Sequence, residues 1–495
     1  MTSDNSGAES GFRRGYLIAV VFLTIVGAAL RFHHLNSGLW YDEIKTVLIS
    51  IRLPLIQLVT HFPDNNDHLF YSLMAKLSTM LFGESPWSVR LPAALFGIAS
   101  IPMLYRVGTS VTSRREAFLA TAILTVSYHH VWFSQNARGY TALLFWVLLA
   151  TFLLLQWVLY DKKKPLVGYA VVAALGSYTH LTMVFVVVAH AMTCIYVLWV
   201  QKKSENASQD WRYPAAAFAM GGMLTILLYA PLLADVHRFF AASPSKGEIA
   251  TPIWAFWSAI SGLQVGFGTL WSVSLAGVIA GVGFLSYFRQ RVAIALIFVL
   301  PAPVTLTLAI AMGRPIFPRF IFFLIGFALL IAVRGATTIG DWISARTEAH
   351  FPMPWLGSAM AIVLTIGAVG VSIRSLPYEY RYPKQDFRGA IDFVEKNRRA
   401  EDLVAVFGKA MAIPVLDYFR KPWLRVDTAE QLRSVRLRGR KVWLVYTTVA
   451  YMKANTPALW DLIQRECARL ESFEGTVAGG KVYVDRCPPA DRETE

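Results

Sequence analysis

The chain has 495 residues, of which 55% are hydrophobic and only 16% are charged, and its mean hydropathy is +0.45. This composition excludes an ordinary soluble enzyme and predicts a protein that crosses a membrane several times. The net charge of +15 could indicate nucleic-acid binding, but most basic residues up to residue 373 lie between apolar runs. We therefore expect them to set the topology and to meet anionic lipid heads, and we expect no nucleic-acid partner.

Apolar runs recur along the first three quarters of the chain and predict eleven membrane helices. A basic doublet, Arg13–Arg14, precedes the first run, as in a signal peptide, but no small-residue cleavage site follows it. We therefore expect this run to be retained as the first helix. The expected helices cover residues 16–32, 88–105, 117–134, 140–160, 166–179, 181–200, 214–233, 271–288, 292–312, 319–334 and 355–373.

Basic residues concentrate in alternate loops between these runs, for example at Arg114–Arg115 and at Lys162–Lys164. By the positive-inside rule, these loops and the N-terminus are cytoplasmic, and eleven crossings put the end of the chain outside. The long first outer loop, residues 33–87, contains two stretches that we expect to form interfacial helices, 42–51 and 68–83. The second stretch is too short to span a bilayer, and Lys76 interrupts it.

The sequence changes character at residue 374, where short strand-like runs begin to alternate with helix-like ones. We expect a membrane domain over residues 1–373 and a small extracytoplasmic α/β domain over residues 374–495. The expected strands are 403–408, 423–426, 441–449 and 481–485, and the expected helices are 386–397, 409–419, 428–434 and 455–469. Cys467 and Cys487 both lie in this tail, where an oxidising compartment makes either a disulfide or two free thiols plausible.

Unusual polar residues gather in the loops that we expect on the outer face. Each of them also has an ordinary structural role to play. The acidic pair could begin a helix, loop aspartates could be solvated turn residues, arginines could snorkel to lipid phosphate, and histidines could simply pack. These residues are Asp42 and Glu43, Asp64, Asp67 and His68 in "DNNDHLFY", Arg138 and Tyr140 in "SQNARGY", His180, and Arg314 and Arg319 in "GRPIFPRF".

The combination of these residues favours a chemical role. Arginines can bind a phosphate bidentately, and a carboxylate can take a proton from an attacking hydroxyl. Together they suit a lipid substrate whose phosphate lies in the headgroup layer and whose sugar reaches the water. Trp40, Tyr41 and other aromatic residues of the outer loops could stack on sugars, although anchoring at the interface is their commoner role.

Five stretches of the chain together resemble the bacterial GT-C glycosyltransferases, membrane enzymes related to dolichyl-phosphate-mannose protein mannosyltransferases, aminoarabinose transferases and rhizobial galacturonosyltransferases. The resemblance implies a polytopic α-helical membrane fold of GT-C type, a polyprenyl-phosphate-linked sugar donor and inverting transfer at the outer face of a bacterial plasma membrane. The acceptor would be a glycan, lipid or protein. The stretches are "DE" at 42–43, "FGESPWSVRLPAALFGIASIPMLYRVG" at 82–108, "SQNARGYTALLF" at 134–145, "GRPIFPRFIFFLIGFALLIA" at 313–332 and "YPKQDFRGAIDFV" at 382–394.

The resemblance also implies roles for single residues. Asp42 matches the catalytic acidic position of the first loop, with Glu43 as its companion, and Arg138 matches a polar position facing the active site. His68 is an approximate match, because "NDHLFY" lacks the family's proline pair. We expect Asp42 to act as general base, and Arg138, aided by Arg319 or His68, to offset charge on the leaving phosphate. Arg314, Tyr140 and Asp67 complete the candidate substrate-binding set.

Two questions stay open from the sequence. Asp42 and Asp67 could hold a magnesium or manganese ion, although a monophosphate donor does not demand one. A transporter or lipid-linked-sugar flippase is the rival function, but such proteins usually carry ionisable groups near the bilayer midplane and repeated halves. The expected spans here have few charges, and the chain has no visible repeat.

Overall fold

The structure is a computed structural model, and it describes residues 4–62, 68–202, 209–241, 252–313, 317–347 and 353–490. The chain divides into two units. The first, which we call the bundle, comprises Met1–His33, Pro54–Phe82 and Arg90–Leu376. The second, which we call the tail unit, comprises His34–Leu53, Gly83–Val89 and Pro377–Glu495.

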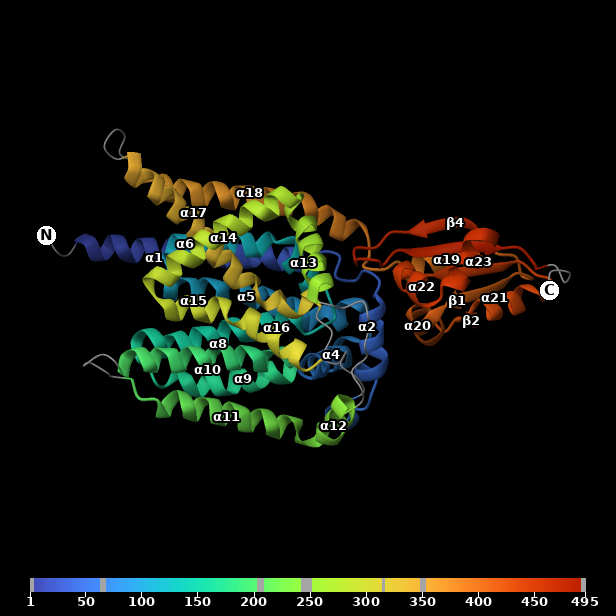
Figure 1. Ribbon diagram of the computed structural model, residues 1–495, viewed down its shortest axis with the longest axis horizontal. Helices are drawn as coiled ribbons and strands as arrows, with labels where there is room; N and C mark the ends of the chain where they lie inside the picture. The colour runs from blue at the N-terminus through green and yellow to red at the C-terminus, as the bar shows by residue number, and fades with distance from the viewer. Residues whose placement is uncertain are drawn as a thin grey trace. The chain divides into compact units, whose positions relative to one another are not determined.

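The bundle is helical throughout its described residues (Figure 1). Its core surrounds α8, whose side chains are buried on nearly all sides. The helices with residues in the bundle are α1 (Asp4–Phe32), α3 (Leu55–Thr60), α4 (Leu69–Phe82), α5 (Pro86–Val111), α6 (Arg114–Val126), α7 (Tyr128–Ser134), α8 (Tyr140–Tyr160), α9 (Pro165–Thr179), α10 (Thr182–Lys202), α11 (Arg212–Tyr229), η2 (Ala230–Leu232), α12 (Leu233–Ala241), α13 (Pro252–Phe267), α14 (Leu270–Gln290), α15 (Val292–Val299), α16 (Pro301–Ala311), η3 (Pro318–Leu324), α17 (Ile325–Thr347) and α18 (Leu356–Arg381).

Eight helices of the described ranges are long and apolar enough to cross a membrane. The pair α15 and α16 adds a ninth crossing that bends by 43° next to Pro301, where a proline disrupts the helical hydrogen bonding. These nine segments coincide with nine of the eleven expected spans. Of the other two, 117–134 forms two helices that break at Ser127, and 166–179 forms α9, which is short and packs between α8 and α11.

The helices α14 and α17 cross closely, and two glycines permit it. A Cβ atom on Gly283 would lie 1.9 Å from the carbonyl oxygen of Ile331, and one on Gly335 would lie 1.9 Å from that of Ile279. Any larger side chain would therefore push the two backbones apart. Small residues at such contacts are typical of helices that pack within a membrane.

The expected interfacial stretches of the first loop are both helical. The first forms α2 (Tyr41–Thr46) and a short π-helix, η1 (Val47–Ile51), and the second forms α4. A short helix that the sequence did not predict, α3, lies between them. Both α2 and η1 belong to the tail unit, whereas α3 and α4 belong to the bundle.

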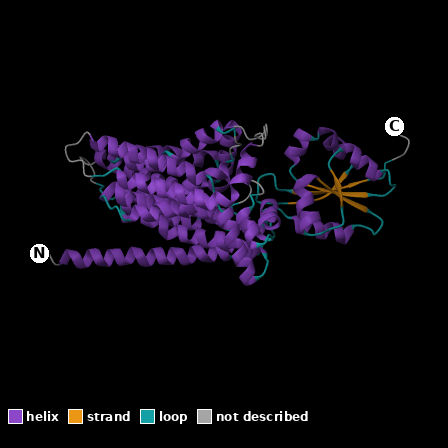
Figure 2. Ribbon diagram, turned by 90° about the horizontal axis from the view of Figure 1, so that it is seen from below, coloured by secondary structure: helices purple, strands orange, loops and turns teal. Residues whose placement is uncertain are grey.

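The rest of the tail unit is a five-stranded sheet in the order β2-β1-β3-β5-β4, with helices on both faces (Figure 2). The strand β1 lies between β2 and β3 and runs parallel to both, and β5 runs antiparallel to β3 and β4. This confirms the predicted α/β fold. The elements are α19 (Phe387–Asn397), β1 (Leu403–Phe407), α20 (Gly408–Ala412), η4 (Ile413–Tyr418), β2 (Leu424–Val426), α21 (Ala429–Arg436), β3 (Val442–Tyr446), α22 (Val449–Asn455), α23 (Pro457–Glu466), β4 (Ala468–Phe473) and β5 (Val482–Cys487).

One strand of this sheet, β4, was not predicted from the sequence. The expected helix 455–469 ends instead at Glu466 as α23, and the chain continues as β4. The strand escaped the prediction because it lies at the sheet edge, where its side chains are exposed or half-buried and carry no alternating apolar pattern. The expected strand 441–449 is also shorter, because β3 ends at Tyr446.

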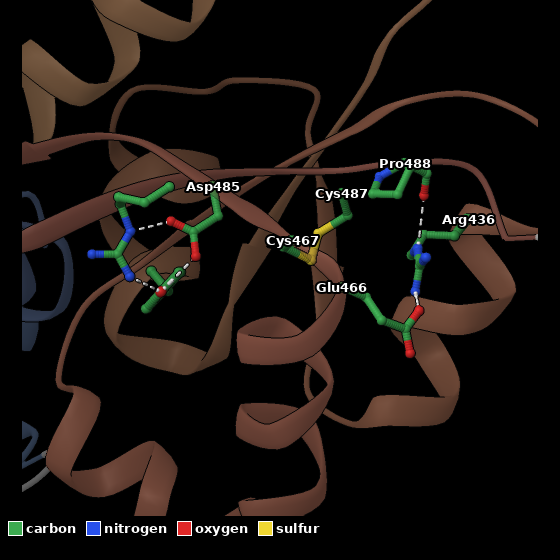
Figure 3. The surroundings of a disulfide bond; sticks show 8 residues. Arg436, Glu466, Cys467, Asp485, Cys487 and Pro488 are labelled. Atoms are coloured by element: carbon green, nitrogen blue, oxygen red, sulfur yellow. Dashed lines mark hydrogen bonds and ion pairs between the residues drawn. A yellow bond between two sulfur atoms is a disulfide. The ribbon is translucent and has the colours of Figure 1, made fainter.

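Cys467 and Cys487 form a disulfide, which decides between the two alternatives left by the sequence (Figure 3). The bond ties the residue before β4 to the last residue of β5. Beside it, Arg436 forms an ion pair with Glu466 at 2.5 Å and donates from Nε to the carbonyl oxygen of Pro488 at 2.8 Å (Figure 3). These contacts fasten the C-terminal end of the sheet to α21 and α23.

Replacing Cys467 and Cys487 together by serine should lower the stability of the tail unit by about 3 kcal/mol, the usual effect of opening a loop of this size. Thermal unfolding followed by a tail-specific probe would measure the change, with Cys194→Ser as the control because Cys194 is the free cysteine of the described chain. Thiol titration of the denatured wild type should find one thiol without reductant and three with it. Three thiols in the unreduced sample would contradict the disulfide.

Candidate active site

The turn between α7 and α8 carries Arg138 and is fastened to α1 from both sides. Gln135 donates from Nε2 to three carbonyl oxygens at the end of α1, those of Leu30, Arg31 and His33, at 3.3, 3.1 and 2.5 Å. In return, Arg31 donates from Nη1 to the carbonyl oxygen of Thr125 at 3.0 Å, where α6 ends. We call these reciprocal bonds the α1 clasp. Each helix end is thereby supplied with donors that the chain itself does not provide.

Three aromatic rings from distant parts of the chain meet beside this turn. The centroids of His68 and Tyr140 are 5.1 Å apart, those of His68 and His180 are 4.9 Å apart, and those of Tyr140 and His180 are 5.7 Å apart. His68 precedes α4, Tyr140 begins α8 and His180 ends α9. Gly139 makes room for them, because a Cβ atom there would lie 2.9 Å from Nδ1 of His68.

Two arginines complete what we call the basic cluster: His68, Arg138, Tyr140, His180 and Arg319. The guanidinium of Arg138 is buried and lies 5.8 Å from the ring centroid of Tyr140. The guanidinium of Arg319 lies 4.4 Å from the ring centroid of Phe317. Both guanidinium groups thus lie near aromatic rings, and the guanidinium group is the side chain that best matches the geometry of a phosphate.

The two histidines of the basic cluster are uncharged at neutral pH. Burial, followed by the charge of Arg138, holds the pKa of His68 well below its ordinary range. Burial and the charges of Arg138 and Arg319 lower the pKa of His180 to about 3. The positive charge of the cluster therefore resides on the arginines.

Several polar atoms of the basic cluster are buried without a hydrogen-bond partner in the described ranges. They are Nδ1 of His68, the hydroxyl of Tyr140 and Nε of Arg319. Buried polar atoms are nearly always hydrogen-bonded to protein or to water, so these three atoms are available to a polar ligand or to water. Together with the arginines, they could bind an anion such as a phosphate.

The acidic pair lies in the tail unit, where the two residues have different surroundings. Glu43 is fully buried, and its Oε2 accepts from the backbone N–H of Trp40 at 3.1 Å. Its carboxylate thus stabilises the start of α2, as an acidic side chain does in a capping box. Asp42 is half-buried, and its backbone oxygen accepts from Thr46 at 2.9 Å.

The α/β domain fixes the position of α2. Gln385 accepts through Oε1 from the backbone N–H of Tyr41 at 3.0 Å, and it donates through Nε2 to the hydroxyl of Thr447 at 3.5 Å. The preceding residue, Lys384, forms a buried ion pair with Glu379 at 3.2 Å. The helix α2 also packs against η4. The catalytic candidate Asp42 is therefore carried on a helix that the tail unit anchors.

Two candidates, Asp67 and Arg314, lie outside the described residues. Within the described ranges, no three histidine, cysteine or acidic side chains come together in a way that could hold a metal ion. A metal ion at Asp42 and Asp67 thus stays a prediction.

The residues that support the basic cluster and the acidic pair were not predicted from the sequence. Gln135 stands in the quoted "SQNARGY" and Gln385 in "YPKQDFRGAIDFV", but neither motif shows which backbone groups these amides bind. Arg31 lies at the end of the first apolar run, 16–32. A buried arginine inside such a run is itself a signal, because an intramembrane charge needs partners.

Residues 67–233 match the model of the family described as dolichyl-phosphate-mannose-protein mannosyltransferase. "Putative mannosyltransferase YkcB" of Bacillus subtilis (strain 168) is 24% identical over 159 residues. That match covers 32% of this chain and only 21% of YkcB, so the chain spans about a fifth of this relative's length. The family match includes the stretch from His68 to His180, which contributes four residues to the basic cluster.

Solved structures resemble the chain over nearly its whole length. ArnT from Cupriavidus metallidurans matches in the apo state with a TM-score of 0.55 at 14% identity, covering 97% of this chain and 98% of ArnT. Its structure bound to undecaprenyl phosphate gives a TM-score of 0.52, with 96% and 98% covered. The oligosaccharyltransferase AglB from Archaeoglobus fulgidus gives 0.50 at 11% identity, covering 98% of this chain and 75% of AglB. The chain thus has the GT-C fold of these structures, and its residues 67–233 resemble the family of dolichyl-phosphate-mannose-protein mannosyltransferases.

Proposed function

We propose that the chain is an inverting glycosyltransferase that moves a sugar from a polyprenyl-phosphate donor to a hydroxyl of a cell-envelope glycan, lipid or protein. The observation that carries the proposal is the basic cluster, where two arginines adjoin buried polar atoms with no partner among the described residues. Such a cluster suits the phosphate of a lipid-linked sugar. The ArnT structure that contains undecaprenyl phosphate supports this class of donor.

In this proposal, the basic cluster binds the phosphate of the donor. Arg138 and Arg319 offer planar guanidinium groups that can bind two phosphate oxygens at once. The hydroxyl of Tyr140 adds a hydrogen-bond donor that carries no charge of its own, and the uncharged ring of His68, which bonds the backbone of Thr179, packs beside it. When the bond from the anomeric carbon to the phosphate oxygen breaks, negative charge grows on that oxygen, and the two guanidinium groups stabilise it.

Asp42 acts as the general base. The oxygen of the acceptor hydroxyl forms a bond to the anomeric carbon, while the bond from that carbon to the phosphate oxygen breaks. The proton of the hydroxyl passes to the carboxylate of Asp42, and the polyprenyl phosphate leaves with the bonding electrons. A single displacement of this kind inverts the anomeric carbon. Glu43 keeps α2 in its conformation through Trp40 and so orients its neighbour Asp42.

We also propose that the reaction takes place at the outer face of a bacterial plasma membrane, with the tail unit's α/β domain outside. The alternating basic loops support this orientation. A disulfide in the tail supports it as well, because such bonds persist in oxidising compartments.

Replacing Asp42 by asparagine should lower kcat by about 100-fold or more, since the amide cannot accept the proton while the side chain keeps its shape. Radiolabelled transfer from a defined polyprenyl-phosphate sugar to cell-envelope acceptors would measure this loss. The matched control is Asp427→Asn, because Asp427 is a half-exposed residue of the tail unit that pairs only at the surface with Arg425. Full activity of Asp42→Asn would remove Asp42 from its role.

Replacing Arg138 by lysine should weaken donor binding and slow transfer, although the charge is kept, because an ammonium cannot bind two oxygens in the plane of a guanidinium. We expect roughly a tenfold loss of kcat/KM for the donor, the effect of one or two weakened charge-assisted hydrogen bonds. Arg291→Lys, which changes an exposed arginine in the same way, should leave it unaltered. Equal values for the two variants would count against phosphate binding at Arg138.

Donor affinity should be nearly constant between pH 7.5 and pH 5.5. Burial and the nearby arginines hold the pKa of His68 well below its ordinary range and lower the pKa of His180 to about 3, so we expect neither ring to gain a proton in this window, and the donor phosphodiester stays singly charged. Binding of the donor to the Asp42→Asn variant, which prevents turnover, would measure this directly. A histidine with an ordinary pKa near 6.5 would instead bind the anion several-fold more tightly as the pH falls.

A further inference from the structure

A basic hollow lies at the other end of α6 from the α1 clasp. It has a volume of about 510 Å³ and is open to the surface. The first turn of α6 borders the hollow, and the α1 clasp binds the last carbonyl oxygens of the same helix. The lining comes from α1, α6, α17 and α18, and it includes Tyr16, Ser113, Arg114, Arg115, Thr337 and Ser358.

The hollow carries positive charge that the described residues do not neutralise. Arg115 donates to the hydroxyl of Ser358, and no described carboxylate pairs with Arg114 or Arg115. Glu116, which also lines the hollow, is already committed, because it pairs with Arg334 at 3.3 Å and accepts from the backbone N–H of Ser113 at 3.4 Å. Two arginines are therefore left to bind an anion.

Aromatic residues indicate that this end of the bundle lies at a membrane surface. Trp342 near the end of α17 and Trp355 just before α18 are 56% and 59% exposed. The guanidinium of Arg346 lies 4.3 Å from the ring centroid of Trp342. Exposed tryptophans and arginines at helix ends are typical of the headgroup layer of a bilayer. An anion that reaches the hollow from this layer would be a lipid headgroup.

We propose that this hollow binds the phosphate of an anionic phospholipid, and that the bound lipid joins α6 to α17 and α18. Basic pockets between membrane helices bind such headgroups through arginine, which matches phosphate geometry. Ser358 and the hydroxyl of Tyr16 add neutral hydrogen-bonding groups at the same place. The lipid stabilises the folded chain, because it binds a surface that unfolding would take apart.

Native mass spectrometry of the full chain, with phosphatidylglycerol or phosphatidylcholine added, tests the proposal. Each arginine near an anionic headgroup contributes a factor of about five, so we expect roughly a 30-fold preference for phosphatidylglycerol in the wild type. The double variant Arg114→Gln/Arg115→Gln should lose this preference. The matched control Arg289→Gln/Arg291→Gln removes two exposed arginines beside α14 and should keep it.

A thermal-shift series with the same proteins separates the sources of phosphate. Phosphatidylglycerol should raise the Tm of the wild type and of the control but not that of the Arg114→Gln/Arg115→Gln variant, whereas inorganic phosphate alone should raise none of them. An equal rise with inorganic phosphate alone would overturn a lipid as the ligand. Equal phosphatidylglycerol binding by both double variants would overturn the site itself.

Discussion

Backbone groups that leave a helix inside an apolar bundle need partners from the protein itself, and the α1 clasp supplies them. Arg31 binds the carbonyl oxygens where α6 ends, and Gln135 binds those where α1 ends. The carbonyl oxygens at the ends of α1 and α6 thus receive their hydrogen bonds from side chains of the protein. The turn that carries Arg138 begins at Gln135, so the geometry of the basic cluster depends on this exchange of hydrogen bonds.

The tail unit gives the acidic pair a comparable support. A six-residue helix such as α2 would be marginal by itself, because its few internal hydrogen bonds do not offset the entropy of forming it. Gln385, the packing of η4 and the buried carboxylate of Glu43 together hold it. The α/β domain therefore has a structural role beyond its own fold. It fixes α2, which precedes Gln385 by more than 300 residues.

Long apolar runs made the bundle predictable, since composition alone decides whether a helix suits a membrane. The break at Ser127 was not predicted, because the hydrogen bonds at this helix end come from Arg31, which lies far away in the sequence and donates to the carbonyl oxygens of Leu124 and Thr125. In the tail, buried strands such as β3 were predictable, but the exposed edge strand β4 was not. Arg138, Tyr140 and His68 were named from their motifs, whereas their convergence with His180 depends on the packing of α4, α8 and α9.

The Cys467–Cys487 disulfide makes the maturation of the tail depend on where the chain is when β4 pairs with β5. In a reducing cytosol this edge of the sheet would be held by its ladder bonds alone, and an exposed edge strand is prone to open and to pair with other chains. An exported tail acquires the covalent bond only after translocation. With the proposed orientation, in which the tail lies outside, delivery across the membrane precedes closure of the sheet, and the sheet edge is locked only in molecules that have reached an oxidising compartment.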